Sequence, residues 1–122
     1  MEDATLSAAA GDGTATVTVL GEVDFSNAGE VSDEIREAVD QFRPSVLYID
    51  LKDASFVDST GLGALIEGYH AAGERDCRFV VVNPNANFRR VLAVTGLSEL
   101  FGLTEIEGAG LGDFETTEAT GA

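Results

Sequence analysis

The order of hydrophobic and polar positions along the chain predicts several strands. Residues 14–19 (TATVTV) alternate, which is typical of a strand with one buried and one solvated face. Residues 4–9 can pair with this segment across the turn AGDG, so an opening hairpin is expected. The runs SVLYIDL (residues 45–51) and CRFVVVN (residues 77–83) are almost continuously apolar, which favours central strands covered on both faces. A last short strand is expected over residues 103–106.

Helical spacing begins after the first strands. Asn27 is the expected N-cap of a helix that Pro44 limits, and Glu30, three residues after Asn27, is placed to reach back in a capping box. One stripe of this helix is apolar at the i, i+4, i+7, i+8 and i+11 positions, which are Val31, Ile35, Ala38, Val39 and Phe42.

Two more helices are predicted further along the chain. Apolar residues at i, i+3, i+4 and i+7 indicate an amphipathic helix over about residues 59–72, with Gly73 as its stop. Asn83 and Pro84 supply a cap and a first-turn proline for a third helix, which Gly96 ends.

Strands that alternate with helices predict an α/β fold with right-handed crossovers. We expect a mixed sheet of four to five strands with about three helices packed on it. The domain is expected to span residues 1–107. Residues 108–122 are rich in Gly, Thr and Glu, and we expect this acidic tail to be disordered.

Composition agrees with one folded domain and restricts its partners. The chain has 122 residues, 44% hydrophobic and 24% charged, which is enough for one core. Its 7 basic and 22 acidic residues give a net charge of −15, so nucleic acid and anionic membranes would repel it. The charge is compatible with a basic patch on a partner, with a merely soluble surface, or with salt adaptation.

Other features of the sequence indicate a cytoplasmic protein without a disulfide. Cys77 is the only cysteine, and we expect it to be a small buried residue at the start of a strand. The N-terminus lacks a basic segment followed by an apolar core, and no apolar run approaches the length of a membrane span.

Motifs for catalysis or cofactor binding are missing from the sequence. Ser59 lies outside any G-x-S-x-G elbow, and His70, the only histidine, is about three helical turns further along the chain. A dinucleotide fingerprint would need glycine where Ile66 stands, and no Gly-Lys-Ser/Thr occurs. We therefore predict that the protein is not an enzyme and has no cofactor or metal site.

The stretch FVDSTGLG (residues 56–63) places an aspartate and two hydroxyls at a strand-to-helix junction. One interpretation is a simple N-cap, in which Asp58 or Ser59 accepts a hydrogen bond from a free amide of the first turn. The other is a modification site, because a helix start can accommodate a phosphate without damage to the fold. The spacing alone leaves both interpretations open.

The sequence resembles the STAS domain family, and within it the bacterial anti-sigma factor antagonists. The resemblance covers about residues 14–106 and rests on GEVD (residues 21–24), VLYIDL, FVDSTGLGALI, RFVVVN and VLAVTGL. It implies a cytoplasmic partner-switching regulator. The unmodified protein would bind an anti-sigma factor that is also a serine kinase, and sigma factor would thereby be released. The kinase would phosphorylate Ser59, and a serine phosphatase would reverse the modification.

The resemblance also implies which residues meet the partner: Asp24, Asp58, Ser59, Thr60, Gly61, Leu62 and Gly63. Asp24 corresponds to an acidic residue close to the phosphorylation site, while Gly61 and Gly63 are expected to leave the helix end open. Two departures from the family are the lack of a predicted helix after Gly108 and a polar stretch, FSNAGEV, after Asp24. The alternative function is a structural STAS subunit of a stress-sensing or lipid-transport assembly, without a phosphorylation switch.

Overall fold

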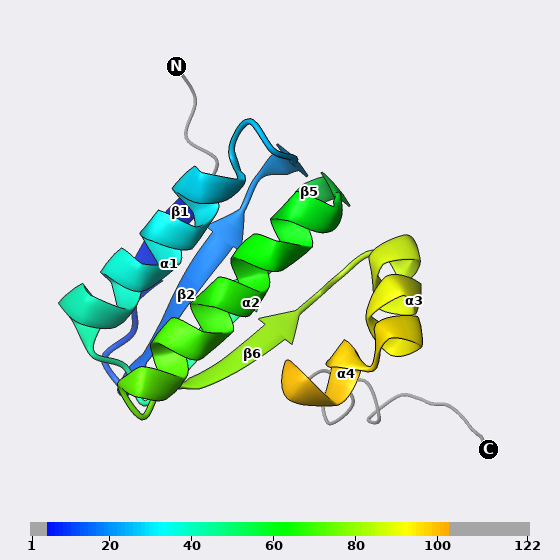
Figure 1. The fold of residues 1–122 in the computed structure, drawn as a ribbon. Coiled ribbons are helices and arrows are strands. Elements are labelled where there is room, and N and C mark those ends of the chain that lie inside the picture. The colour runs from blue at the N-terminus through cyan, green and yellow to red at the C-terminus, as the bar shows by residue number, and fades with distance from the viewer. Residues whose placement is uncertain (1–4, 103–122) are drawn as a thin grey trace.

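Four strands form the main sheet of the computed structural model, which describes residues 5–102. Their order in the sheet is β1 (Thr5–Ala9), β2 (Thr14–Val19), β4 (Val46–Asp50) and β6 (Arg78–Val82). Strand β1 pairs with β2 in antiparallel fashion, whereas β2, β4 and β6 run parallel (Figure 1). The predicted opening hairpin and mixed sheet are confirmed.

A second, smaller sheet joins β3 (Gly21–Val23) to β5 (Ala54–Val57). The two strands are parallel, and Val23 lies opposite Val57. The sequence pattern does not predict this sheet, because strands of 3 residues (β3) and 4 residues (β5) show too little alternation to be recognised. Both strands lead into a helix, so their carboxyl ends bring two helix starts to one end of the molecule.

Helices α1 (Ala28–Phe42) and α2 (Ser59–Glu74) lie side by side over one face of the main sheet (Figure 1). Helices α3 (Ala86–Thr95) and α4 (Leu97–Leu100) follow β6 and pack against each other. Helix α4 was not predicted, because its single turn carries no periodic signal.

The hydrophobic core fills the space between the helices and the main sheet. The predicted stripe of α1 is buried there, except for Phe42, which is partly buried against the core. Cys77 is buried just before β6, as expected, and burial raises the pKa of its thiol. The main sheet contributes Val17, Leu47, Ile49, Phe79 and Val81.

The predicted capping box at the start of α1 is wrong. Asn27 occupies the N-cap position, but its side chain makes no capping hydrogen bond to the helix. Its Oδ1 accepts from the backbone N–H of Asp24 at 2.9 Å, and its Nδ2 donates to the carbonyl of Glu22 at 2.8 Å. Asn27 therefore fastens the helix start to the end of β3.

Two predicted boundaries are also displaced. Helix α2 continues through Gly73 to Glu74, so Gly73 is not its stop. Helix α3 is capped by Asn85, whose side chain accepts from the N–H of Phe88 at 2.8 Å. Asn83 cannot cap it, because its backbone is left-handed (φ 58°) and its amide donates to Asp50 at 3.1 Å.

The predicted end of α3 is correct, since Gly96 caps it in the left-handed conformation. The strand expected over residues 103–106 and the tail expected over 108–122 lie outside the described residues.

Candidate functional site

The small sheet brings two aspartates to adjacent strand ends. Asp24 follows β3 and Asp58 follows β5, and the last residues of these strands, Val23 and Val57, are register partners. The N–H of Asp58 donates to the carbonyl of Val23 at 3.0 Å. Because neighbouring strands lie about 4.8 Å apart, Asp24 and Asp58 begin their loops side by side.

Asp58 is the N-cap of α2. Its Oδ1 accepts a hydrogen bond from the N–H of Gly61 at 2.9 Å and another from the hydroxyl of Thr60 at 2.6 Å. The Thr60 hydroxyl and then the Gly61 amide lower the pKa of Asp58 below its ordinary value of 3.8. Of the two capping candidates in the sequence, Asp58 therefore fills the role.

The same contacts distinguish the two neighbouring hydroxyls. Ser59 and Thr60 are both exposed in the first turn of α2. The Thr60 hydroxyl is engaged with Asp58, whereas the Ser59 hydroxyl has no hydrogen-bond partner among residues 5–102. Ser59 thus presents an uncommitted hydroxyl at the positive end of a helix dipole.

The next three residues of α2 face different surroundings. Gly61 is buried, and a Cβ placed on it would lie 2.8 Å from a methyl carbon of Val23 and 2.8 Å from one of Val57. It therefore holds the helix close to the small sheet, rather than leaving this end of the helix open as expected. Leu62 is partly buried against the core, while nothing would meet a Cβ on Gly63.

Asp24 is half-buried and organises the loop before α1. Its carboxylate accepts from the N–H of Ser26 at 3.0 Å and from the Ser26 hydroxyl at 2.6 Å. Its carbonyl accepts from the N–H groups of Asn27 and Ala28, at 3.1 and 2.8 Å. These contacts hold the acidic side chain at the loop that adjoins Asp58.

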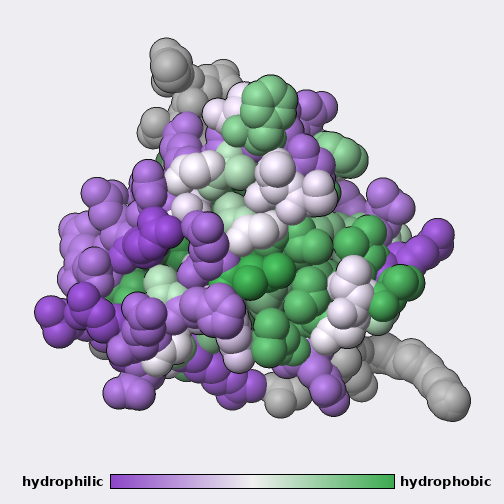
Figure 2. All heavy atoms as spheres, viewed as in Figure 1, coloured by the Kyte–Doolittle hydropathy of each residue, from purple (hydrophilic) through white to green (hydrophobic). Residues whose placement is uncertain are grey.

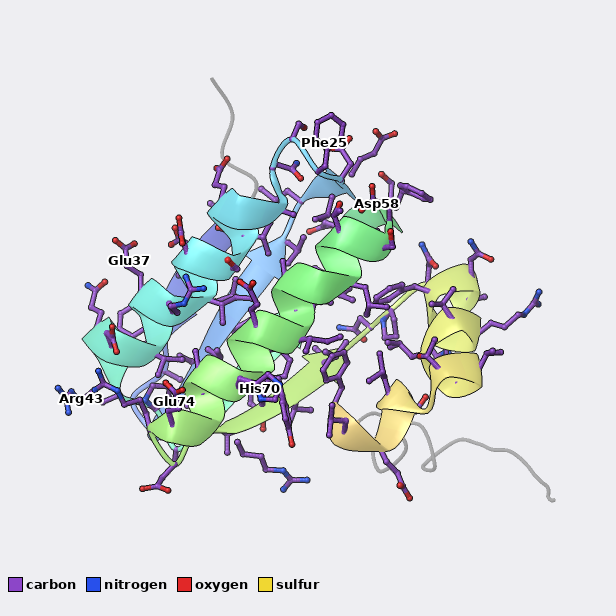
Figure 3. All side chains as sticks on the ribbon, viewed as in Figure 1. Phe25, Glu37, Arg43, Asp58, His70 and Glu74 are labelled. Carbon is purple, nitrogen blue, oxygen red and sulfur yellow. The ribbon has the colours of Figure 1, made fainter. Side chains whose placement is uncertain are left out.

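Two aromatic residues at this end were not singled out in the sequence. Phe25 is 83% exposed, and Phe56 is 49% exposed on β5, three residues before Ser59. Figure 3 shows Phe25 and Asp58 at the same end of the molecule, on the loop before α1 and at the start of α2. Phe25 lies alone in a polar loop and belongs to no apolar stripe. That isolation is the feature of the sequence by which it could have been recognised as exposed.

Nucleophilic catalysis by Ser59 is not supported by the geometry. His70 lies on α2 toward its other end (Figure 3), roughly 16 Å from Ser59 at a rise of about 1.5 Å per residue. Within residues 5–102, no three His, Cys, Asp or Glu side chains are grouped to hold a metal ion. The described helices also include none with the length and apolar character needed to cross a membrane.

The sequence and the structure of this chain are similar to those of known proteins. Residues 6–110 match the STAS domain. The chain is 30% identical over 95 residues to the anti-sigma-B factor antagonist of Listeria monocytogenes, covering 75% of this chain and 80% of that protein. The anti-sigma factor antagonist of Mycobacterium paratuberculosis has a similar structure, with a TM-score of 0.69, 34% identity and 80% of each chain covered.

A more distant structure has the same fold. The Bacillus cell fate determinant SpoIIAA in its phosphorylated form aligns with a TM-score of 0.63 and 21% identity, over 91% of each chain. The match to the family over most of the sequence, together with the level of identity to the Listeria protein, settles the classification. This chain belongs to the STAS domain family.

Proposed function

We propose that this protein is an anti-sigma factor antagonist whose binding is controlled by phosphorylation of Ser59. In the unphosphorylated form it binds an anti-sigma factor and thereby releases sigma factor. The similarity to relatives named anti-sigma-B and anti-sigma F factor antagonists supports this role. The anti-sigma factor is also the serine kinase in this proposal, and a serine phosphatase restores the binding form.

The uncommitted Ser59 hydroxyl is the observation that carries the switch. It is exposed at the start of α2, while the hydroxyl beside it, on Thr60, is held by Asp58 at 2.6 Å. A kinase that approaches this helix end can phosphorylate the Ser59 hydroxyl without breaking an existing hydrogen bond. Ser59 is therefore the proposed acceptor, and Thr60 the residue that helps to hold the cap.

The chemistry requires little of this chain. In the kinase complex, the Ser59 Oγ attacks the γ-phosphorus of ATP, an O–P bond forms, ADP leaves, and the hydroxyl proton passes to a base on the kinase. ATP and magnesium belong to the kinase. The phosphatase transfers the phosphoryl group to water and returns the hydroxyl.

Phosphorylation would change the surface while the fold persists. The phosphate adds about −1.5 to −2 charges. The free amides at the start of α2 favour that charge, so the helix tolerates it. Asp24 and Asp58 already make this end acidic, and a third anionic group beside them repels or blocks a partner that contacts it. Loss of binding is the expected result.

A matched pair of variants tests the acceptor. Each candidate anti-sigma kinase from the source genome is incubated with Mg-ATP and the wild type, Ser59→Ala or Thr60→Ala, and the phosphate is located by mass mapping. Modification is expected in the wild type and in Thr60→Ala, and is expected to be lost in Ser59→Ala. Equal phosphate incorporation into Ser59→Ala would refute Ser59 as the acceptor.

A second experiment tests the consequence of the charge. Ser59→Asp should remain folded and bind the anti-sigma factor more weakly in calorimetry, with Ser59→Ala as the neutral control. Unchanged affinity would contradict the switch. A stable large assembly in sedimentation, together with no binding of the wild type to any candidate anti-sigma factor, would instead favour a structural subunit.

A further inference from the structure

Two phenylalanine side chains project into solvent at the end of the molecule where α2 begins (Figure 3). Among the phenylalanines in residues 5–102, Phe25 and Phe56 are the exposed ones, at 83% and 49%. Phe25 follows Asp24 in the loop before α1, and Phe56 lies on β5, just before the cap of α2. Exposed apolar side chains that cluster inside a polar border mark interaction sites, so the position of both rings at the end that carries the candidate site indicates a binding surface.

A shallow groove continues this apolar surface toward α3. It has a volume of about 100 Å³, and Phe56, Val57, Phe88 and Val91 contribute its apolar lining. Val91 is itself 39% exposed. The surface therefore combines a projecting ring, Phe25, with a recess beside the second ring, Phe56.

Acidic side chains border the two rings. Glu22 is exposed and lies opposite Phe56 in the β3–β5 register, and Asp53 is exposed immediately before β5. Asp24 and Asp58 directly follow the same two strands. Lys52 is the basic residue next to Asp53, so the border is predominantly but not wholly acidic.

Figure 2 shows this end of the molecule with hydrophobic spheres that project among hydrophilic ones. An apolar centre inside a charged border is the usual arrangement of a protein interface, in which aromatic residues at the centre dominate the affinity. The negative border selects a partner surface of the opposite charge.

We propose that Phe25 and Phe56 are the anchors by which this protein docks on its anti-sigma factor, whose surface offers an apolar recess bordered by Lys and Arg side chains. This inference rests on the proposed function and adds the residues that carry the affinity. Ser59 follows Phe56 by three residues, and its neighbour Asp58 lies at the same end of the molecule as Phe25 (Figure 3). A phosphate on Ser59 would put an anion beside the buried rings, and the cost of desolvating it is expected to weaken the contact.

Calorimetry and binding kinetics at low and high salt test the proposal. The proteins compared are the full-length wild type, Phe25→Ala, Phe56→Ala and the double variant, each titrated against the anti-sigma factors of the source genome. Leu100→Ala is the matched control, because Leu100 is 39% exposed and lines a hollow with His70, far along α2 from Ser59.

Each phenylalanine variant is expected to bind about tenfold more weakly or worse, the loss typical of a truncated aromatic anchor. The loss should appear as faster dissociation, with the salt dependence of affinity unchanged. Glu22→Gln should instead slow association and reduce the salt dependence. Leu100→Ala should bind as the wild type does.

The outcomes separate this inference from the proposed function. If the wild type binds an anti-sigma factor and the double variant binds it equally well, the anchors are refuted while the antagonist role stands. If the wild type binds none of the anti-sigma factors, the proposed function fails and this inference fails with it. Circular dichroism of each variant verifies the fold. Because both rings are exposed, Phe25→Ala and Phe56→Ala are expected to change Tm little.

Discussion

Gly61 and Gly63 lie in the same first turns of α2, and replacing each by alanine should have opposite effects on stability. A Cβ at position 61 would lie 2.8 Å from methyl carbons of Val23 and Val57, and 3.1 Å from the Cβ of Val23. Val23 is only 2% exposed, so it has no free space into which to move. A Cβ at position 63 would meet nothing within 4 Å.

The change in the free energy of unfolding of each variant is the sum of a gain in helix propensity and a cost of steric crowding. Alanine in place of glycine within a helix stabilises a protein by about 0.5–1 kcal/mol. Forcing an extra methyl group into a packed site typically costs about 1–3 kcal/mol. Gly63→Ala should therefore gain about 0.5–1 kcal/mol, whereas Gly61→Ala should have a net loss that reaches about 2 kcal/mol.

Urea unfolding monitored by circular dichroism measures both free energies of unfolding. The comparison is internal, because helix propensity contributes equally to both variants and only the packing against β3 and β5 differs. Val57→Ala combined with Gly61→Ala should lose less than the sum of the two single losses, since Val57→Ala removes one of the two methyl contacts. The reasoning would be refuted if Gly61→Ala proved as stable as Gly63→Ala.

Three further predictions concern the cap and the helices. Thr60→Val removes the hydroxyl that lowers the pKa of Asp58. Because the folded pKa is depressed, the resulting stability is present above pH 3.8 and is lost as pH falls through the folded value, so acid titration should show the wild-type advantage disappearing. Gly68→Ala would place a Cβ 2.8 Å from Ile35, and urea unfolding should show a net loss that reaches about 2 kcal/mol once the gain in helix propensity is subtracted. Arg36→Ala breaks exposed ion pairs only, so thermal unfolding should change by less than about 1 kcal/mol.

The sequence by itself determined the main elements of the fold. Strands β2, β4 and β6 and the buried stripe of α1 follow from apolar periodicity, because burial imposes a period of two on a half-buried strand and about 3.6 on a helix. It also placed Asp58, Ser59 and Thr60 at a helix start. The predicted cap of α3, Asn83, was wrong, because Asn85 also precedes the helix with a suitable side chain and only the backbone conformation of the structure shows that Asn85 fills the role.

Tertiary structure decided how the site is assembled. Local sequence cannot reveal the pairing of β3 with β5, which are separated by α1 and β4, yet this pairing brings Asp24 beside Asp58. It also encloses Gly61 between two valines and leaves Phe25 in solvent. Exposure and close contact are properties of segments distant in the chain, and they become defined only when the small sheet and α2 pack together.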